Sequence, residues 1–347
     1  MANPPIIALV GSESLMGREI RDIAATSTPE LPLKLIAAEN EEPGALTRVG
    51  DTPAVVGGLD ADALAGAGAV VLAGGADSAR QALELLDGDD GTAIIDLTGF
   101  AEERPDARLR APLVEADGET AAGDEGEVAE DPADGRVHVI AHPAAIALAL
   151  FLRRLHAHDP ILRSVVEIFA PASEHDLRGV NELQQQTISL LSFQSLPRAV
   201  FDAQLSFNML ARYGEEAPAS LEDTELRIER HLATLLALPG EGSGAPLPSL
   251  RLIQAPVFHG YSISAWVEFD GNPGIEALEA GLAAGPIEVR TGEFEPPTNV
   301  GQAGQSGIAV GGISVDRNNP EACWFWLVAD NLRLAAENAA EVARQLP

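Results

Sequence analysis

The chain has 347 residues, a length that favours two domains over one, and 46% of them are hydrophobic, which is enough for sizeable cores. Its formal net charge is −31, from 22 basic and 53 acidic residues, and a surface this acidic disfavours binding to nucleic acids and anionic membranes. The single cysteine, Cys323, excludes internal disulfides and cysteine-rich metal sites.

Targeting and metal signals are weak. No apolar run reaches the roughly 18 residues of a membrane span, and "MANPPIIALVGSE" lacks the basic region of a signal peptide, so we expect a cytoplasmic protein. The seven histidines show no metal-ligand spacing. His156 and His158, at a predicted helix end, are interpreted as a solvated terminus, and no metal is expected.

The N-terminal region alternates apolar strands with helices. Strands are predicted within 4–11, 31–39, 69–72 and 91–99, and helices within 16–26 and 77–88. Asp77 or Ser78 is expected to cap the second of these helices. Unbroken apolar strands between helices indicate a parallel sheet covered on both faces, so the fold class is α/β with a Rossmann-like domain. The acidic segment 101–136 that follows is predicted to be mostly an exposed loop.

The stretch "HVIAHPAAIALALFLRRL" predicts a strand, a sharp turn at His142-Pro143 and a buried helix. Amides at the start of such a helix can stabilise a negative charge, which leaves open a small anionic ligand. From about 161 the pattern becomes α+β with a mostly antiparallel sheet. We predict a Rossmann-like domain over 1–142, completed by the closing helix at about 330–347, and a second domain over 143–329.

Several details of the second domain are predicted. Leu226, Leu232, Leu235 and Leu236 are expected in the core of a helix near 220–238. The strands "ISAWVEF" and "CWFWLVA" have apolar residues on both faces, so one face should pack on helices and the other on a partner, which predicts a homodimer. Trp324 and Trp326 are interpreted as core and interface.

The stretch "ALVGSESLMGREI" places Gly11 after a strand and Gly17 at a helix start, as a dinucleotide loop requires. Ser14 stands where a third glycine is usual, and its Cβ should make a positive φ or a close approach costly. The loop, with Ser12 and Leu15, therefore either binds a nucleotide or only connects a strand to a helix. Glu13, beside the loop, is also unfavourable for a phosphate.

Acidic residues follow the second strand, at Glu39, Glu41 and Glu42. These carboxylates would repel a 2′-phosphate. Of the two nicotinamide cofactors, NAD is therefore favoured over NADP.

Five stretches carry a family resemblance: "VGSESLMG", "HPAAIALAL", "VNELQQQT", "IQAPVFHGYS" and "WFWLVADNLRLAAENAAEVA". In order and spacing the chain resembles the aspartate-semialdehyde dehydrogenase family, most closely its Usg-type branch, whose members often lack the full catalytic set. The resemblance implies an NADP-binding N-terminal domain and a second domain for catalysis and dimerisation. It also implies reductive dephosphorylation of aspartyl phosphate, in which a cysteine attacks the acyl phosphate and a histidine handles the proton.

The resemblance places replacements at the chemical positions. Ala144 stands at the family's cysteine and Tyr261 at its histidine, while His259 lies two residues earlier and could compensate only if the backbone bends. Cys323, in a different strand, cannot substitute because it reads as a small buried hydrophobe.

The anion-binding positions also differ. Gln254 replaces the substrate-binding arginine, Ala101 follows Phe100 where another arginine is expected, and Asn40 replaces a basic residue. The glutamine-containing helix, with Glu182 and Gln185, is the part that looks retained, although both side chains could equally cap or line a helix. Asn331 is either a nicotinamide contact or, as we favour, an N-cap of the closing helix.

Three interpretations remain. The leading one is a dimeric binding or partner protein with the dehydrogenase fold that has lost the family reaction. The second is an NAD-dependent oxidoreductase that uses His259 or Tyr261 as acid and base without a covalent intermediate. The third is a non-catalytic partner subunit of a catalytic paralogue.

Overall fold

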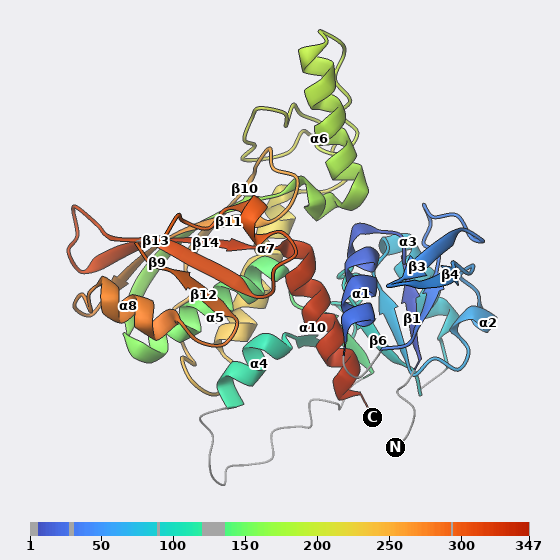
Figure 1. The fold of residues 1–347 in the computed structure, drawn as a ribbon, viewed down its shortest axis with the longest axis horizontal. Helices are drawn as coiled ribbons and strands as arrows, with labels where there is room; N and C mark the ends of the chain where they lie inside the picture. Colours follow the sequence, from blue (N-terminus) through green and yellow to red (C-terminus); the bar gives the residue numbers. More distant parts are fainter. Residues whose placement is uncertain (1–5, 28–30, 89–90, 120–135, 293, 347) are drawn as a thin grey trace. The chain divides into compact units, whose positions relative to one another are not determined.

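The computed structural model describes residues 6–27, 31–88, 91–119, 136–292 and 294–346. The described residues divide into two compact units, one within 1–112, 124–141 and 335–347 and the other within 113–123 and 142–334. Figure 1 traces the elements of both units along the chain. Each unit is described separately below.

The first unit is built on a six-stranded parallel sheet in the order β2-β1-β5-β6-β8-β7. Its strands are β1 (Ile7–Val10), β2 (Leu33–Ile36), β5 (Ala69–Leu72), β6 (Ala93–Asp96), β7 (Ala107–Arg110) and β8 (Val137–Ile140). The strands β1, β5 and β8 are buried along their whole length, as expected of a sheet covered on both faces. The predicted Rossmann-like fold is confirmed.

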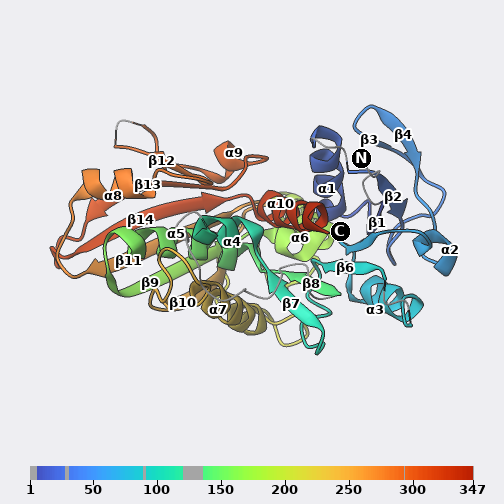
Figure 2. The same cartoon turned by 90° about the horizontal axis from the view of Figure 1, so that it is seen from below.

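The helices and the hairpin of this unit connect those strands. They are α1 (Leu15–Thr26), α2 (Ala61–Leu64), α3 (Ala76–Leu85) and the hairpin of β3 (Leu46–Val49) and β4 (Thr52–Val55). The hairpin stands apart from the main sheet (Figure 2). Ile20, Ile23 and Ala24 are buried on one side of α1, as their spacing predicts.

Two N-terminal predictions are wrong. Within the described residues 101–119 the exposed-loop prediction is wrong, since β7 and the helix α4 (Pro112–Glu119) lie there and Ala101, Ala111 and Val114 are buried. These few apolar residues are enough for an edge strand and a helix, although the charged composition hides them. Residues 120–135 lie outside the described residues. The cap of α3 is Gly75, without a side-chain hydrogen bond, rather than Asp77 or Ser78.

The second unit has a mixed sheet in the order β10-β9-β11-β14-β13-β12. Its strands are β9 (Ile161–Ala170), β10 (Ser249–Gln254), β11 (Tyr261–Phe269), β12 (Ile287–Arg290), β13 (Ile308–Val315) and β14 (Ala322–Ala329). The three central pairings are antiparallel and the two outer pairings are parallel, which confirms the mostly antiparallel prediction.

Helices complete this unit. They are α5 (Pro143–His158), the short 3-10 helix η1 (Ala172–His175), α6 (Asp176–Leu191), α7 (Leu221–Leu236), α8 (Ile275–Leu282) and α9 (Asn299–Gln302). The closing helix α10 (Asn331–Gln345) begins here and continues into the first unit. Leu232, Leu235 and Leu236 are buried in α7 as predicted, but Leu226 is 49% exposed, because it lies outside the apolar stripe of the helix.

The two faces of the second sheet differ in exposure. On one face, Tyr261, Ile263, Ala265, Val267 and Phe269 are completely buried. The opposite face, which we call the open sheet face, carries Val165, Phe169, Trp266, Trp324 and Trp326. Val165 is 45% exposed and Trp324 41% exposed. Among the described residues, no helix combines the length and the apolarity needed to cross a membrane.

Candidate functional site

The predicted turn between a strand and a buried helix is present at residues 140–144. Pro143 opens α5, where its missing N–H costs nothing and its fixed φ suits the helix. His142 is the N-cap, and its Nδ1 accepts a hydrogen bond from the amide of Ala144 at 3.3 Å. The amide of His142 itself donates to Nδ1 of His231 on α7 at 2.9 Å. Ala144 is completely buried, so the first turn of α5 is already capped by an imidazole of its own chain.

A largely buried carboxylate lies at the centre of this site. Glu174, on η1, contacts Nε2 of His142 through Oε1 at 2.9 Å, and its Oε2 accepts a short hydrogen bond from the hydroxyl of Tyr261. Because Nδ1 of His142 accepts from Ala144, the network assigns the ring proton to Nε2, which donates to Glu174. We call His142, Glu174 and Tyr261 the Glu174 triad. It joins the N-cap of α5, the 3-10 helix η1 and the start of β11.

The triad fixes the charge of its members. Burial raises the pKa of Glu174, but its interactions with His142 and the hydrogen bond from Tyr261 outweigh it and lower the pKa to about 2. Burial, followed by the negative charge of Glu174, raises the pKa of Tyr261 well above its ordinary value. Arg227 on α7 opposes that shift through its positive charge. At neutral pH the site therefore holds an ionised carboxylate and a protonated phenol.

A second set of hydrogen bonds surrounds Gln254, the residue expected where the family has an arginine. Its Oε1 accepts from the hydroxyl of Tyr213 at 2.7 Å, and its Nε2 donates to the carbonyl oxygens of Ala170 and Ala255 at 2.9 and 3.2 Å. Nε2 of His175 lies 2.8 Å from the same Tyr213 hydroxyl. Burial raises the pKa of Tyr213 and lowers that of His175. The side chain of Gln254 thus makes three hydrogen bonds within its own chain.

The backbone bends between His259 and Tyr261, which is the condition under which His259 could compensate. His259 precedes β11, and Gly260 between the two residues has a φ of +81°, so the backbone bends before the strand begins. Nδ1 of His259 is buried and, among the described residues, has no hydrogen-bond partner.

The retained glutamine-containing helix, α6, supports a neighbouring segment. Glu182 accepts hydrogen bonds from the amides of Val200 and Phe201 at 2.7 and 3.2 Å. Gln186 binds the same segment through both ends of its amide. Gln185 contacts Ser189 on its own helix at 3.5 Å. The structure therefore gives Glu182 and Gln186 a role in positioning residues 197–206.

Asn331 is not the cap of α10. Its Oδ1 accepts hydrogen bonds from the hydroxyl of Ser173 at 3.1 Å and from the amide of Gly260 at 3.0 Å, and so ties η1 to the start of β11. Asp330 caps the helix instead, because its Oδ1 accepts from the amides of Leu332 and Arg333 at 3.0 Å. The capping prediction is wrong by one residue, since both residue types suit the cap.

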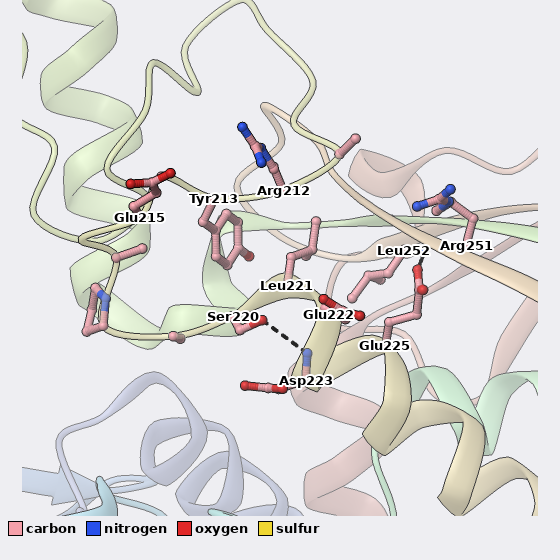
Figure 3. A pocket seen from close by; sticks show the side chains of 15 residues that line it. Arg212, Tyr213, Glu215, Ser220, Leu221, Glu222, Asp223, Glu225, Arg251 and Leu252 are labelled. Atoms are coloured by element: carbon pink, nitrogen blue, oxygen red, sulfur yellow. Dashed lines mark hydrogen bonds between the residues drawn. The ribbon is translucent and has the colours of Figure 1, made fainter.

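A cavity of about 550 Å³ lies beside the second set of hydrogen bonds (Figure 3). Tyr213 lines it, and Ser220 at the start of α7 accepts from the amide of Asp223 at 3.3 Å. The charged side chains in its lining are Arg212, Arg251, Glu215, Glu222, Asp223 and Glu225. With carboxylates outnumbering arginines, the cavity offers no net positive field for an anion.

The first unit contains the loop between β1 and α1. It lies where the sheet order reverses between β1 and β5, the usual ligand position in such sheets. Gly11 has a φ of +85°, and a Cβ there would lie 2.3 Å from the nitrogen of Gly74; a Cβ on Gly17 would lie 2.0 Å from the oxygen of Gly11. Both glycines are thus required by the backbone itself.

The strain expected at Ser14 is not present. Its φ of −60° and ψ of 165° are ordinary extended values, and it is the N-cap of α1. Its Oγ accepts from the amide of Gly17 at 2.9 Å and lies 2.8 and 2.7 Å from the carbonyl oxygens of Gly11 and Ala73. Ser12 is completely buried and Leu15 begins α1. No group of His, Cys, Asp or Glu side chains within the described ranges is arranged to hold a metal ion.

Comparison with known proteins shows which family this chain belongs to. The model of the "Semialdehyde dehydrogenase, dimerisation domain" matches residues 152–334, more than half of the chain. The chain belongs to the semialdehyde dehydrogenase family. It is 28% identical to the "USG-1 protein homolog" of Pseudomonas aeruginosa, over 97% of this chain and 95% of that protein. It is 26% identical to the aspartate-semialdehyde dehydrogenase of Prochlorococcus marinus, over 99% and 96% of the two chains.

Solved structures show the same fold. A probable aspartate-semialdehyde dehydrogenase from Pseudomonas aeruginosa matches with a TM-score of 0.80 at 26% identity, covering 99% of this chain and 98% of that one. Aspartate semialdehyde dehydrogenase II from Vibrio cholerae matches with a TM-score of 0.80 and the same coverage at 21% identity. The resemblance seen in the motifs is confirmed at the level of the family.

NADP is the cofactor named for one structural relative, the Candida albicans enzyme, with a TM-score of 0.67 at 14% identity over 99% of this chain and 98% of that one. The glycines of the β1–α1 loop fit such a cofactor, because they leave room for backbone approach. The acidic side chains beside the loop do not fit the phosphates of such a cofactor. Carboxylates of Glu41 and Glu39 accept hydrogen bonds from the amides of Glu13 and Ser78, at the loop and at the start of α3. A phosphate at these amides would meet negative charge.

Sequence reasoning missed the triad and the role of Glu41. His142 was interpreted only as the residue that ends a strand, and Glu174 sits in "APASEHD" without any motif. The one signal in the sequence is an acidic residue shortly after a long apolar strand, with Pro171, Ala172 and Ser173 between them. For Glu41 the acidic run predicts repulsion of a 2′-phosphate, but not the hydrogen bond that Glu41 accepts from the loop amide.

Proposed function

We propose that this chain is a homodimeric semialdehyde dehydrogenase homologue that has lost the family's thiol-dependent reaction and acts as a binding or partner protein. The observation that supports the proposal is the Glu174 triad. A largely buried, ionised carboxylate is hydrogen-bonded to Tyr261 and to the imidazole that caps Ala144.

The triad is unsuited to acyl transfer from an acyl phosphate. Attack on the acyl carbon requires a nucleophile, and the methyl group of Ala144 is not nucleophilic. Because its pKa is raised, Tyr261 keeps its proton at neutral pH and cannot act as the base. Glu174 places a negative charge where an anionic substrate would need positive groups. Gln254 is neutral and makes its hydrogen bonds with Tyr213 and the backbone.

The named relatives define the reaction to be tested. Several of them are called aspartate-semialdehyde dehydrogenase, and one is called a USG-1 protein homolog. Together with the replacements above, the latter name supports a place in the Usg-type branch. The substrate class in question is therefore a β-carboxyl aspartyl derivative.

A covalent intermediate is the direct signature of the family chemistry. We expect intact-protein mass spectrometry to detect no acyl adduct after incubation with aspartate semialdehyde and either nicotinamide cofactor. Cys323, buried in β14, is the only thiol, and burial raises its pKa, so it should remain unmodified. An adduct that survives denaturation and maps to one side chain would contradict the proposal.

Dimerisation is proposed through the open sheet face. Apolar and aromatic side chains that remain partly exposed on a central sheet favour burial against a second copy. We expect a dimer at micromolar concentration in light scattering. Val165→Glu on that face should yield monomers, whereas Leu226→Glu, an equally exposed leucine on α7, should leave the dimer intact. A monodisperse wild-type monomer would contradict this part of the proposal.

The buried Nδ1 of His259, without a partner among the described residues, favours one alternative: an oxidoreductase that uses His259 in non-covalent acid–base chemistry. This alternative requires nicotinamide cofactor binding. If calorimetric titration detects no cofactor at millimolar concentration, the alternative fails. If the wild type shows turnover that His259→Ala abolishes, this result would support the oxidoreductase alternative and contradict our proposal.

A further inference from the structure

The segment between β2 and β3 carries three glutamates, and two of them bind backbone amides of the first unit. Glu41 is partly buried and Glu39 and Glu42 are exposed. Glu41 and Glu39 reach different amides, both at the carboxyl edge of the parallel sheet. Glu42, the next residue after Glu41, carries the same charge, but its side chain accepts no hydrogen bond from a backbone amide among the described residues.

Glu41 bridges its own segment to the β1–α1 loop. Its Oε1 accepts from the amide of Glu13 at 3.0 Å and its Oε2 from the amide of Ala38 at 3.2 Å. The amide of Ser14 also favours its ionised form. Burial nevertheless raises the pKa of Glu41, and the nearby charge of Glu13 adds to that shift. Arg21 and Arg18 face Glu13 and form ion pairs with it.

Glu39 makes the equivalent contact at the next helix. Its Oε2 accepts from the amide of Ser78 in the first turn of α3 at 3.2 Å. The approach depends on Gly75, where a Cβ would lie 2.1 Å from Oε1 of Glu39. The starts of two helices at one sheet edge are thus both occupied by carboxylates of a single segment.

Backbone amides at the start of a helix after a glycine turn are the groups that bind phosphate in dinucleotide sites. A carboxylate has the same charge sign and the same oxygen acceptors. Ser12 gives an independent sign that this loop is built for a polar ligand. It is completely buried, and its Oγ lacks a hydrogen-bond partner among the described residues.

We propose that Glu41 is a tethered anion that occupies the phosphate-binding amides of the β1–α1 loop and excludes dinucleotides from this chain. Glu39 reinforces the exclusion at α3. The loop keeps the glycines of a cofactor site, while its anion is supplied by the protein. The inference concerns binding only, so its failure would leave the argument about Ala144 and Glu174 in the second unit untouched.

The tether lowers dinucleotide affinity by the fraction of molecules in which Glu41 is displaced. A charge-assisted pair of hydrogen bonds held within one chain keeps that fraction at roughly a tenth or below. Removing the side chain should therefore tighten binding on the order of tenfold or more. Glu41→Gln, which keeps the acceptor oxygen but not the charge, should give a smaller gain.

The test is calorimetric titration of the full chain with NAD, NADP and inorganic pyrophosphate. We expect no binding up to millimolar concentration for the wild type and for Glu42→Ala, which removes an equal charge from the same segment. Glu41→Ala should bind pyrophosphate and at least one dinucleotide, and Glu39→Ala combined with it should bind more tightly.

Two results would overturn the proposal. The first is dinucleotide binding by the wild type that Glu41→Ala weakens, because Glu41 would then accept hydrogen bonds from a ribose. The second is no binding by the double variant while its circular dichroism and thermal unfolding match the wild type. If the double variant unfolds, Glu41→Gln serves as the folded test, and failure of that variant to bind pyrophosphate more tightly than the wild type overturns the proposal equally.

Discussion

The ionised Glu174 should give this chain a pH-dependent part of its stability that Glu174→Gln removes. Burial raises the pKa of this carboxyl, but His142 and Tyr261 outweigh it and lower the pKa from 4.5 to about 2. A pKa lowered on folding adds stability that is fully present above pH 4.5 and is lost as the pH falls toward 2. At about 1.4 kcal/mol per unit of pKa, this shift corresponds to roughly 3 kcal/mol. The side chain is only 17% exposed, so solvent screening is limited.

Urea unfolding followed by tryptophan fluorescence measures this contribution. All three tryptophans, Trp266, Trp324 and Trp326, lie in the sheet of the unit that contains Glu174. We expect Glu174→Gln to lower the free energy of unfolding at pH 7 by about 3 kcal/mol, and the difference from the wild type to shrink as the pH falls from 4.5 to 2.

A matched control is Glu321→Gln, an exposed glutamate in the same unit, which should change stability by less than about 0.5 kcal/mol. The reasoning is refuted if Glu174→Gln is as stable as the wild type at pH 7. It is refuted equally by a difference that stays constant between pH 4.5 and 2.

Three further predictions follow from the two sites. Ala144→Cys should not restore turnover in a coupled NADPH assay, because the Glu174 charge, one imidazole away, disfavours the thiolate; turnover would mean that only the sulfur is missing. Ser14→Ala should lower stability by about 1 kcal/mol in thermal unfolding through loss of the α1 cap, and an unchanged midpoint would argue against that role. Gly17→Ala should cost about 1–3 kcal/mol, because its Cβ would lie 2.0 Å from the oxygen of Gly11, and wild-type stability would show that the loop can shift.

Much of the fold follows from local patterns. Unbroken apolar runs and glycine turns predict the parallel sheet, and strands of half-buried residues predict the second sheet, because burial depends on periodicity that a single sequence displays. The failures are local as well. The charged composition of 101–136 hides β7 and α4, and Leu226 fits a helical spacing but lies off the buried stripe. At the start of α10, Asp330 and Asn331 both suit a cap, and only the tertiary contacts of Asn331 decide between them.

The candidate site was less predictable, since its contacts are distant in the chain. The motifs located Ala144 and Tyr261, but the carboxylate between them comes from Glu174, 32 residues after His142 and 87 before Tyr261. No spacing rule connects such positions. Similarly, Glu41 reaches a loop 28 residues away, so the acidic run indicated repulsion of phosphate but not that its own oxygens occupy the amides.

The most direct test of the proposed loss of chemistry is a turnover assay on the purified wild-type chain. The assay supplies aspartate semialdehyde, inorganic phosphate and NAD or NADP, and follows the reduced cofactor by its absorbance. We expect a rate equal to that of the same mixture without protein. Phosphate-dependent turnover that persists through purification and disappears in Tyr261→Phe or His259→Ala would contradict it.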